Sequence, residues 1–177
     1  MEAVQLLKTR RSVRKFTGQK IPEDVLKAVL EDTMMAPSWK NTQTAGYVVA
    51  RSEEMKQKLL AALPPFNARS AELADVIVVM TTRHGRSGFE RDGTYSTVLE
   101  DRWEYFDAGI ACQTFCLAAW ARGLSTCIMG LYDDAAVREI LQLPEEYRIT
   151  AVIPTGYGAE TPAAPKRKPL DEKVTYI

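Results

Sequence analysis

The sequence predicts an α+β fold organised as one domain. Runs with the composition of β-strands are few and far apart, at residues 46–50, 74–82 and 147–154. Most of the chain between them shows the apolar spacing of helices, and this mixture is typical of α+β proteins. The 177 residues contain no internal repeat and no segment with the composition of a linker. One domain with a sizeable core is therefore expected.

The stretch at residues 103–121 predicts a buried helix around which the other elements pack. Apolar residues occur on every side of its helical wheel, which is the pattern of a helix that is covered all round. It is too short and too often interrupted by polar groups for a membrane span. Gly123 is suited to ending it. Its many small residues would let another backbone approach, so it is either the central helix of a monomer or packs against its copy in a second subunit.

The segments before this stretch are assigned from apolar spacing and from residues that begin or end elements. Pro22 is suited to opening a helix, whereas Pro37 disfavours helix at the residue before it. Ser52 can cap a helix that ends before Pro64 and Pro65. The expected elements, in order, are a helix at 2–8 with Ala3, Val4 and Leu7 facing inward, a helix at 23–35, a strand at 46–50, a helix at 52–63, a short helix at 66–73, a buried strand at 74–82, a polar loop at 83–94 and a partial helix at 95–99.

The segments after it are assigned in the same way. Gly123 and Gly130 bound a short extended piece whose backbone could approach a flat ligand closely, because glycine has no Cβ. Asp133 or Asp134 can cap a helix that runs to residue 141. The expected elements then are a strand at 147–154, an extended segment at 161–169, and a strand-like end at 170–177 that would complete a sheet in the same chain or in a neighbour.

Charge and cysteine content exclude several classes of function. Lys+Arg and Asp+Glu both number 23, so the formal net charge is zero, whereas a general nucleic-acid binder carries a basic surplus. Cys112, Cys116 and Cys127 lie on or near the apolar stretch, which favours reduced, buried thiols and a cytoplasmic setting. Cys112 and Cys116 have no second pair of ligands, so we expect no metal site. The N-terminus lacks the apolar core of a signal peptide, and no apolar run reaches ~18 residues. The sequence therefore predicts no contact with a membrane.

Positive charge gathers near the two ends of the chain, at residues 8–20 and 166–168. In the first group, Arg10, Arg11 and Arg14 could bind an anion, since a guanidinium matches phosphate through two parallel hydrogen bonds. The alternative is a solvated basic loop without a ligand.

A second polar segment follows the helix expected at 23–35. Pro37 is followed by Ser38, Asn41 and Gln43, small polar groups that could recognise an amide or the edge of a ring. A capped turn without a ligand is the alternative.

Four motifs, taken in order, resemble the nitroreductase family of FMN-dependent oxidoreductases. Residues 10–16 resemble its opening signature and residues 36–43 its second signature. Residues 107–127 resemble its central helix and the turn that follows, and residues 166–170 its basic closing motif. The resemblance covers nearly the whole chain, and the order of the motifs makes it specific.

The resemblance implies a nitroreductase-like α+β fold with a central mixed or antiparallel sheet flanked by helices. It also implies an intertwined homodimer with FMN at the interface and a C-terminal segment that embraces the other subunit. The implied FMN ligands are Arg10, Arg11 and Ser12 at the phosphate or ribitol, Arg14 near the pyrimidine edge of the ring, Pro37, Ser38, Trp39, Asn41 and Gln43 from the second subunit, Ile128, Met129 and Gly130 along the ring, and Arg167 with either Lys166 or Lys168 at the phosphate.

The activity implied by the resemblance is reduction of a small electron-poor acceptor, such as a nitroaromatic compound or a quinone, by NADH or NADPH. Hydride would pass through N5 of FMN in two half-reactions, so no catalytic side chain is expected. Arg14 would stabilise the negative charge that develops on the reduced ring, because its guanidinium stays charged.

Departures from the family pattern leave alternatives open. Thr44 and Ala45 stand where the family usually has Pro and an aromatic residue, Trp39 is bulky, and the lid is reduced to about residues 83–95. The protein could therefore be a flavin reductase, a reductase for one metabolite, or an FMN-binding sensor with little turnover. A nucleic-acid binder would use only the first basic loop, and the neutral net charge counts against it.

Overall fold

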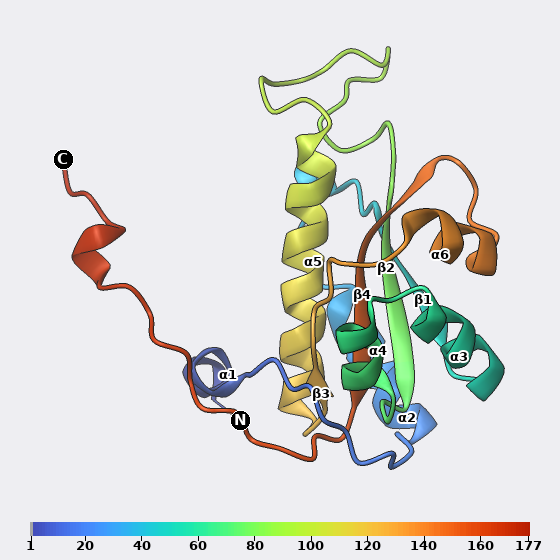
Figure 1. The fold of residues 1–177 in the computed structure, drawn as a ribbon. Coiled ribbons are helices and arrows are strands. Elements are labelled where there is room, and N and C mark those ends of the chain that lie inside the picture. The colour runs from blue at the N-terminus through green and yellow to red at the C-terminus, as the bar shows by residue number, and fades with distance from the viewer. Residues whose placement is uncertain (1) are drawn as a thin grey trace.

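The computed structural model describes residues 2–177 and has the α+β fold that the sequence predicts (Figure 1). The helices are α1 (Ala3–Thr9), α2 (Glu23–Thr33), α3 (Glu53–Ala61), α4 (Pro65–Ala71), α5 (Arg102–Ala121) and α6 (Asp134–Leu141), the strands are β1 (Ala45–Ala50), β2 (Val76–Arg83), β3 (Ser125–Thr126) and β4 (Tyr147–Gly156), and short 3-10 helices cover Trp39–Asn41 and Leu170–Glu172.

The strands form one antiparallel sheet in the order β1-β2-β4-β3. Val79 of β2 lies opposite Val48 of β1 and Val152 of β4. The register between β2 and β4 shifts between Met80 and Thr81. All residues of β2 except Arg83 are buried, because this strand has a neighbour on each side and helices on both faces.

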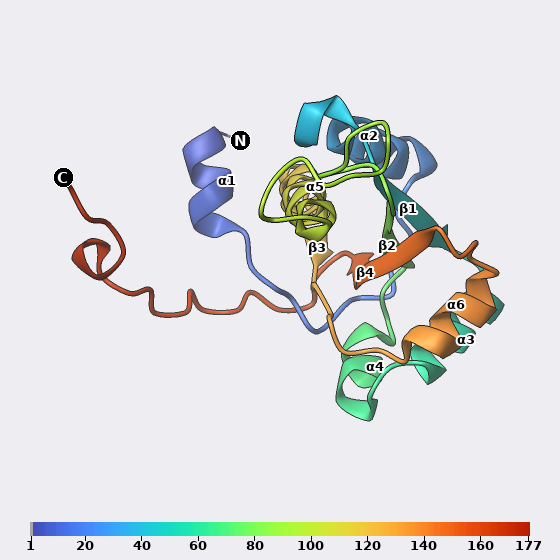
Figure 2. The same cartoon turned by 90° about the horizontal axis from the view of Figure 1, so that it is seen from above.

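Helices cover both faces of the sheet, as Figure 2 shows from above. Successive residues of β2 point to opposite faces, so Val78 joins the core that contains Phe115 of α5 and Val29 of α2. Val79 joins a second core under α3 and α6, which contains Leu59 and other apolar residues. The runs of β-branched residues in β2 and β4 thus supply side chains to two cores at once.

Helix α5 matches the expected central helix, and Gly123 ends it with a φ of +75°. Its inner faces are buried, and Phe115 and Ala119 are fully inaccessible to solvent. Its outer face is not covered in the single chain, where Phe106 is 55% exposed. The caps predicted for two other helices are present: Ser52 accepts a hydrogen bond from Met55 N and heads α3, and the side chain of Asp133 does the same for α6.

The expectation that the apolar residues of α1 face inward is wrong for the single chain. Val4 is 58% exposed and Leu7 is 66% exposed. The helix lies beside the C-terminal end of α5, where Trp120 Nε1 donates to Thr9 Oγ1 at 3.0 Å. No second layer of this chain lies over its other side (Figure 2), so its apolar side chains remain uncovered.

Two other expected elements are absent among the described residues. Residues 95–99 are not helical, because side chains compete for the backbone: Thr97 Oγ1 accepts from Leu99 N, and Glu100 takes a left-handed φ of +54°. The C-terminal end forms only the 3-10 helix Leu170–Glu172 and no strand. It projects away from the domain (Figure 1), so no strand lies beside it.

Within residues 2–177, no helix has the length and apolar character needed to cross a membrane.

Candidate functional site

The first basic loop runs beside β3. Val13 N donates to the backbone oxygen of Thr126 at 3.0 Å, and Ser12 forms an isolated parallel bridge with the same residue. The Val13 side chain is fully buried, which anchors the loop while Arg14 stays exposed. The loop is therefore held next to the segment that leaves β3, which contains Ile128, one of the residues expected at the ring.

The two adjacent arginines of this loop have different surroundings. Arg11 Nη1 donates to the backbone oxygens of Lys8 and Arg10, each at 2.8 Å, so this guanidinium is held against the end of α1. Arg10 is half-buried and makes no ion pair or side-chain hydrogen bond within the described chain. Its positive charge acts on the Cys116 thiol. Arg10 is thus the guanidinium that remains available for an anion.

A cleft lies between α5 and the segment after β3, with a volume of about 270 Å³. Ile128 is 47% exposed at its edge, whereas Met129 is buried and paired with Val152 through two backbone hydrogen bonds. A Cβ added to Gly109 would have no atom within 4 Å, so the cleft is open above this glycine. Its lining residues are Tyr105, Ala108, Gly109, Cys112, Gln113, Ile128, Thr150 and Ala151.

Three buried thiols lie beneath this region, and all are free, as the sequence predicts. A hydrogen bond from the Cys112 thiol lowers the pKa of Cys116, and Thr126 and the charge of Arg10 act in the same direction. The same hydrogen bond, together with burial, raises the pKa of Cys112. Burial also raises the pKa of Cys127. The charge of Arg10 acts on all three thiols and lowers the pKa of each.

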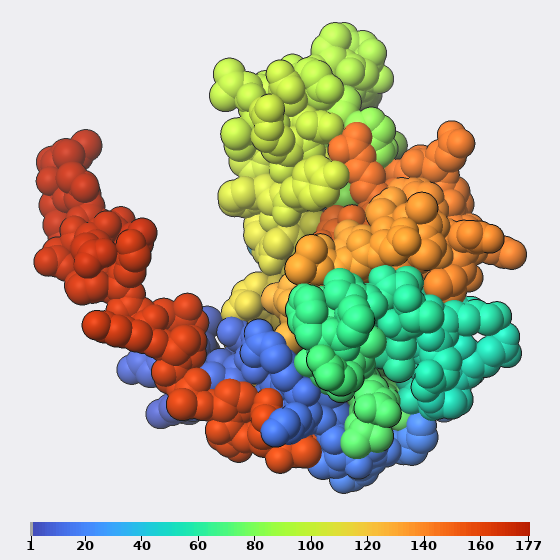
Figure 3. Space-filling model, in the orientation of Figure 1, coloured from blue at the N-terminus to red at the C-terminus, as the bar shows by residue number. Residues whose placement is uncertain are grey.

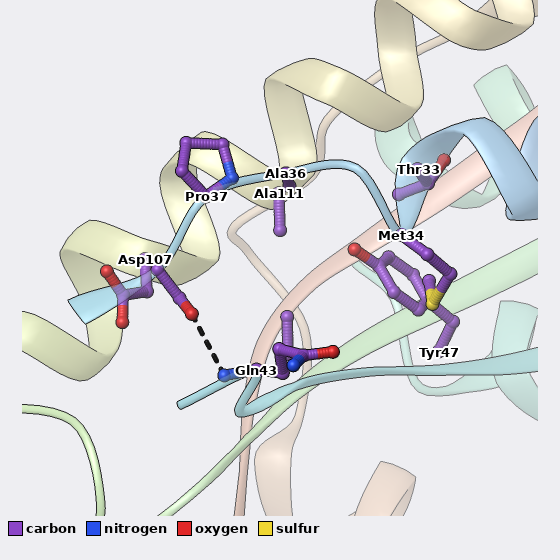
Figure 4. A pocket seen from close by; sticks show the side chains of 10 residues that line it. Thr33, Met34, Ala36, Pro37, Gln43, Tyr47, Asp107 and Ala111 are labelled. Carbon is purple, nitrogen blue, oxygen red and sulfur yellow. Dashed lines mark hydrogen bonds between the residues drawn. The ribbon is translucent and has the colours of Figure 1, made fainter. Parts of the chain in front are cut away.

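The second signature lies on a different side of α5. Trp39 N donates to both carboxylate oxygens of Asp107 at 3.0 Å, and Gln43 N donates to Ser38 Oγ at 2.9 Å. Pro37 and Gln43 border a smaller cavity of about 100 Å³, which Figure 4 shows next to Asp107. Its lining residues are Thr33, Met34, Ala36, Pro37, Ser38, Gln43, Ala45, Tyr47, Asp107 and Ala111.

The backbone of this loop is strained. Lys40, Asn41 and Gln43 have φ values of +44°, +55° and +51°, in a left-handed region that costs a residue other than glycine about 1–3 kcal/mol. Packing compensates for part of this cost, because the Trp39 ring lies 4.4 Å from the ring of Trp103, measured between centroids. A loop held in such a conformation by its surroundings is characteristic of binding sites.

Asp107 is a functional candidate that sequence reasoning did not assign. Its side chain is 2% exposed, and it accepts hydrogen bonds from Trp39 N and from the hydroxyl of Ser87. The available signal was an acidic residue inside an otherwise apolar stretch, because a buried carboxylate needs partners. Asp107 positions the second signature relative to α5.

The basic residues near the C-terminus, Lys166 and Arg167, are exposed and lie on an extended segment. Figure 3 shows the C-terminal end of the tail standing clear of the domain, whereas its beginning lies against the N-terminal residues. Its beginning is tied to the first basic loop, since Arg14 N donates to Glu160 Oε1 at 3.1 Å.

A single chain therefore brings together only part of the expected site. The first basic loop and residues 128–130 are neighbours, residues 37–43 lie across α5, and residues 166–167 lie on the exposed tail.

The profile of the nitroreductase family matches residues 7–157. A protein of Methanothermobacter thermautotrophicus, provisionally named an NADH dehydrogenase/NAD(P)H nitroreductase, is 29% identical over 168 residues, covering 92% of this chain and 80% of its own length.

Solved structures of other proteins share the fold of this chain. A nitroreductase family protein of Clostridium difficile has a TM-score of 0.83 at 24% identity, with 99% of this chain and 98% of that chain covered. An oxidoreductase described as containing FMN has a TM-score of 0.83 at 23% identity, with 99% and 91% covered. The match of the family profile over most of the chain, on a fold of this kind, establishes that the protein belongs to the nitroreductase family.

Proposed function

We propose that the protein is a homodimeric, FMN-dependent oxidoreductase that uses NADH or NADPH to reduce small electron-poor acceptors such as nitroaromatic compounds or quinones. The observation that carries the proposal is the separation of the two signature loops across α5. Each loop flanks the helix on a different side, and the outer face of the helix between them is uncovered. Two copies that meet along α5 would place the second signature of one chain over the cleft of the other.

The cleft has the chemistry that FMN requires. A flavin ring needs a flat apolar surface that backbone can approach closely, and Ala108, Gly109 and Ile128 offer such a surface. A phosphate needs cations at one end of the cleft, and Arg10 and Arg14 lie beside the segment that borders it. The residues present therefore fit the cofactor.

In this site the residues of the chain bind and orient rather than transfer protons. Arg10 would hold the phosphate, and Arg14 would favour the reduced ring through its charge. Ile128 and Gly130 would contact the ring through backbone. Bound FMN supplies the hydride-transfer chemistry, first as acceptor from the nicotinamide and then as donor to the substrate.

The homodimer is supported by the apolar surface that the single chain leaves uncovered. Val4, Leu7 and Phe106 are each more than half exposed, and Tyr176 and Ile177 at the end of the tail are almost entirely exposed. Large apolar side chains left exposed on several elements are the kind of surface that association with a partner covers. The tail projects far enough from its own domain (Figure 1) to lie on a second one, which would carry Lys166 and Arg167 to the partner's cofactor.

The test is the visible absorption spectrum of the purified protein, recorded before and after anaerobic addition of NADH and then NADPH, with the mass measured by sedimentation. A yellow dimer that bleaches, and recovers its colour when a quinone is added, is the expected result. A protein that stays colourless after incubation with excess FMN would rule out the proposal. So would a flavin-loaded dimer that neither reductant bleaches.

A further inference from the structure

A polar pocket lies on the sheet face that faces away from α5, at the end where β2 gives way to the loop before α5. It has a volume of about 280 Å³ and is bordered by Thr42, Gln43, Thr44, Ala45, Gly46, Arg83, Arg86 and Tyr147. A second cavity of about 360 Å³ continues from it and shares Thr42 and Arg86. Each is close to the size at which ligand pockets begin, about 300 Å³.

The sheet register explains why these groups converge. Gly46 lies opposite Thr81, and Arg83 N donates to the backbone oxygen of Thr44, two residues further along each strand. Since alternate residues share a face, Thr44, Gly46 and Arg83 all point to the same side. Thr81 Oγ1 would lie only 2.7 Å from a Cβ at position 46, so a larger residue there would crowd this side of the sheet.

Two hydroxyls in this pocket have no hydrogen-bond partner within residues 2–177. Thr44 is 6% exposed, and its Oγ1 is buried without a hydrogen bond. Thr42 Oγ1 is also buried and unpaired. A buried hydroxyl left unpaired costs free energy, and a ligand that accepts hydrogen bonds would remove that cost.

The pocket also carries uncompensated positive charge. Arg83, Arg86 and Arg91 form no ion pair and no side-chain hydrogen bond within residues 2–177. The one acidic residue that lines either cavity is Glu90, and its carboxylate is paired with Lys40 at 2.8 Å. Guanidiniums with free donors beside unpaired hydroxyls match a tetrahedral oxyanion.

We propose that Thr42, Thr44, Arg83 and Arg86 form a binding site for a phosphate group at the end of the second signature, outside the cleft that Gly109 and Ile128 line in the same chain. The hydroxyls donate to phosphate oxygens, and the two guanidiniums supply charge and forked donors. The phosphate comes either from the ribose phosphate that distinguishes NADPH from NADH or from a separate phosphorylated molecule. The site stands on its own geometry and does not depend on the proposed flavin chemistry.

The experiment is a calorimetric titration of the FMN-loaded, full-length protein with inorganic phosphate. Arg83→Gln and Arg86→Gln should each weaken phosphate binding by about tenfold or more, since each removes a charge-assisted contact. Thr44→Val should weaken it several-fold with no change in charge. Arg69→Gln is the matched control, because it removes one exposed charge on α4, and it should bind phosphate as the unchanged protein does.

Equal phosphate affinity in Arg83→Gln, Arg86→Gln and Arg69→Gln would overturn the proposal, as would absence of phosphate binding by the unchanged protein. Steady-state kinetics of Arg83→Gln then identify the source. A raised KM for NADPH with an unchanged KM for NADH assigns the phosphate to the dinucleotide. Unchanged KM values for both, with binding of inorganic phosphate lost, assign it to a separate molecule. The titration reads binding rather than turnover, so its outcome is independent of flavin reduction.

Discussion

Arg10 and Arg11 are neighbours in the sequence whose guanidiniums have different tasks in the structure. Arg11 is bonded to two backbone oxygens at the end of α1, whereas the Arg10 side chain makes no hydrogen bond within residues 2–177 and its charge lowers the pKa of the Cys116 thiol. We therefore expect Arg10→Ala to weaken FMN binding about tenfold or more, the effect of one charge-assisted hydrogen bond. Arg11→Ala should weaken it less and should destabilise the protein more. Fluorescence titration of FMN and chemical unfolding of both variants would measure this, and a larger loss of FMN affinity in Arg11→Ala would contradict it.

Asp107 holds the second signature loop through a buried carboxylate. Asp107→Asn keeps the volume but removes the charge that Trp39 N and the Ser87 hydroxyl bond to. The expected loss in unfolding free energy is about 1–3 kcal/mol, because hydrogen bonds to a charged group are the stronger ones. Urea unfolding measures it, with Glu145→Gln at an exposed position as control. If both variants unfold at the same urea concentration, the Asp107 contacts do not stabilise the loop.

At the scale of elements, the loop between β2 and α5 is tied to the second signature by Glu90, which accepts from Lys40 at 2.8 Å and from Ser96 at 2.6 Å. The hydrogen bond from Lys40, followed by that from Ser96, lowers the pKa of Glu90 from its ordinary 4.5. The folded loop therefore favours the ionised form. The Glu90 carboxylate therefore contributes fully to the order of this loop above pH 4.5, and the contribution is lost as the pH falls through the lowered pKa of Glu90.

We expect Glu90→Gln to speed amide hydrogen exchange in residues 83–100 near neutral pH and to have no effect once the pH lies below the lowered pKa of Glu90. Salt should reduce the difference, because the ion pair is exposed and screened. Asp92→Asn is the control, since Asp92 lies in the same loop but bonds only to Thr94. An exchange difference that persists unchanged in acid would mean that the Glu90 charge does not order the loop.

At the scale of the whole molecule, the tail after residue 160 makes few contacts with its own domain and stands clear of it (Figure 3). A chain that ends at residue 165 should keep its fold, because both cores are formed by earlier residues. It should retain less FMN and dimerise more weakly, since it lacks Arg167 and the exposed apolar end. Circular dichroism, sedimentation and the flavin absorbance of the purified protein measure these three properties. A truncated chain with unchanged FMN content would show that the tail does not reach the cofactor.

The sequence by itself determined the α+β fold, the extent of α5, the buried β2, the helix caps at Ser52 and Asp133, and the three buried thiols. These features follow from local rules: apolar periodicity, cap residues and composition act within a few residues of one another. The order of the motifs also pointed to the family that the profile comparison establishes.

Only the tertiary structure decided which charged groups have partners and on which side of α5 each loop lies. The contacts of the buried Asp107 with Trp39 N and Ser87, and the pocket around Thr44, arise from residues far apart in sequence. The apolar face of α1 is exposed although it was expected to pack inward, and the tail forms no strand although one was expected. The reason is that an apolar pattern predicts that a surface is covered but not what covers it. Burial and pairing depend on the whole packed chain, so no local pattern could supply them.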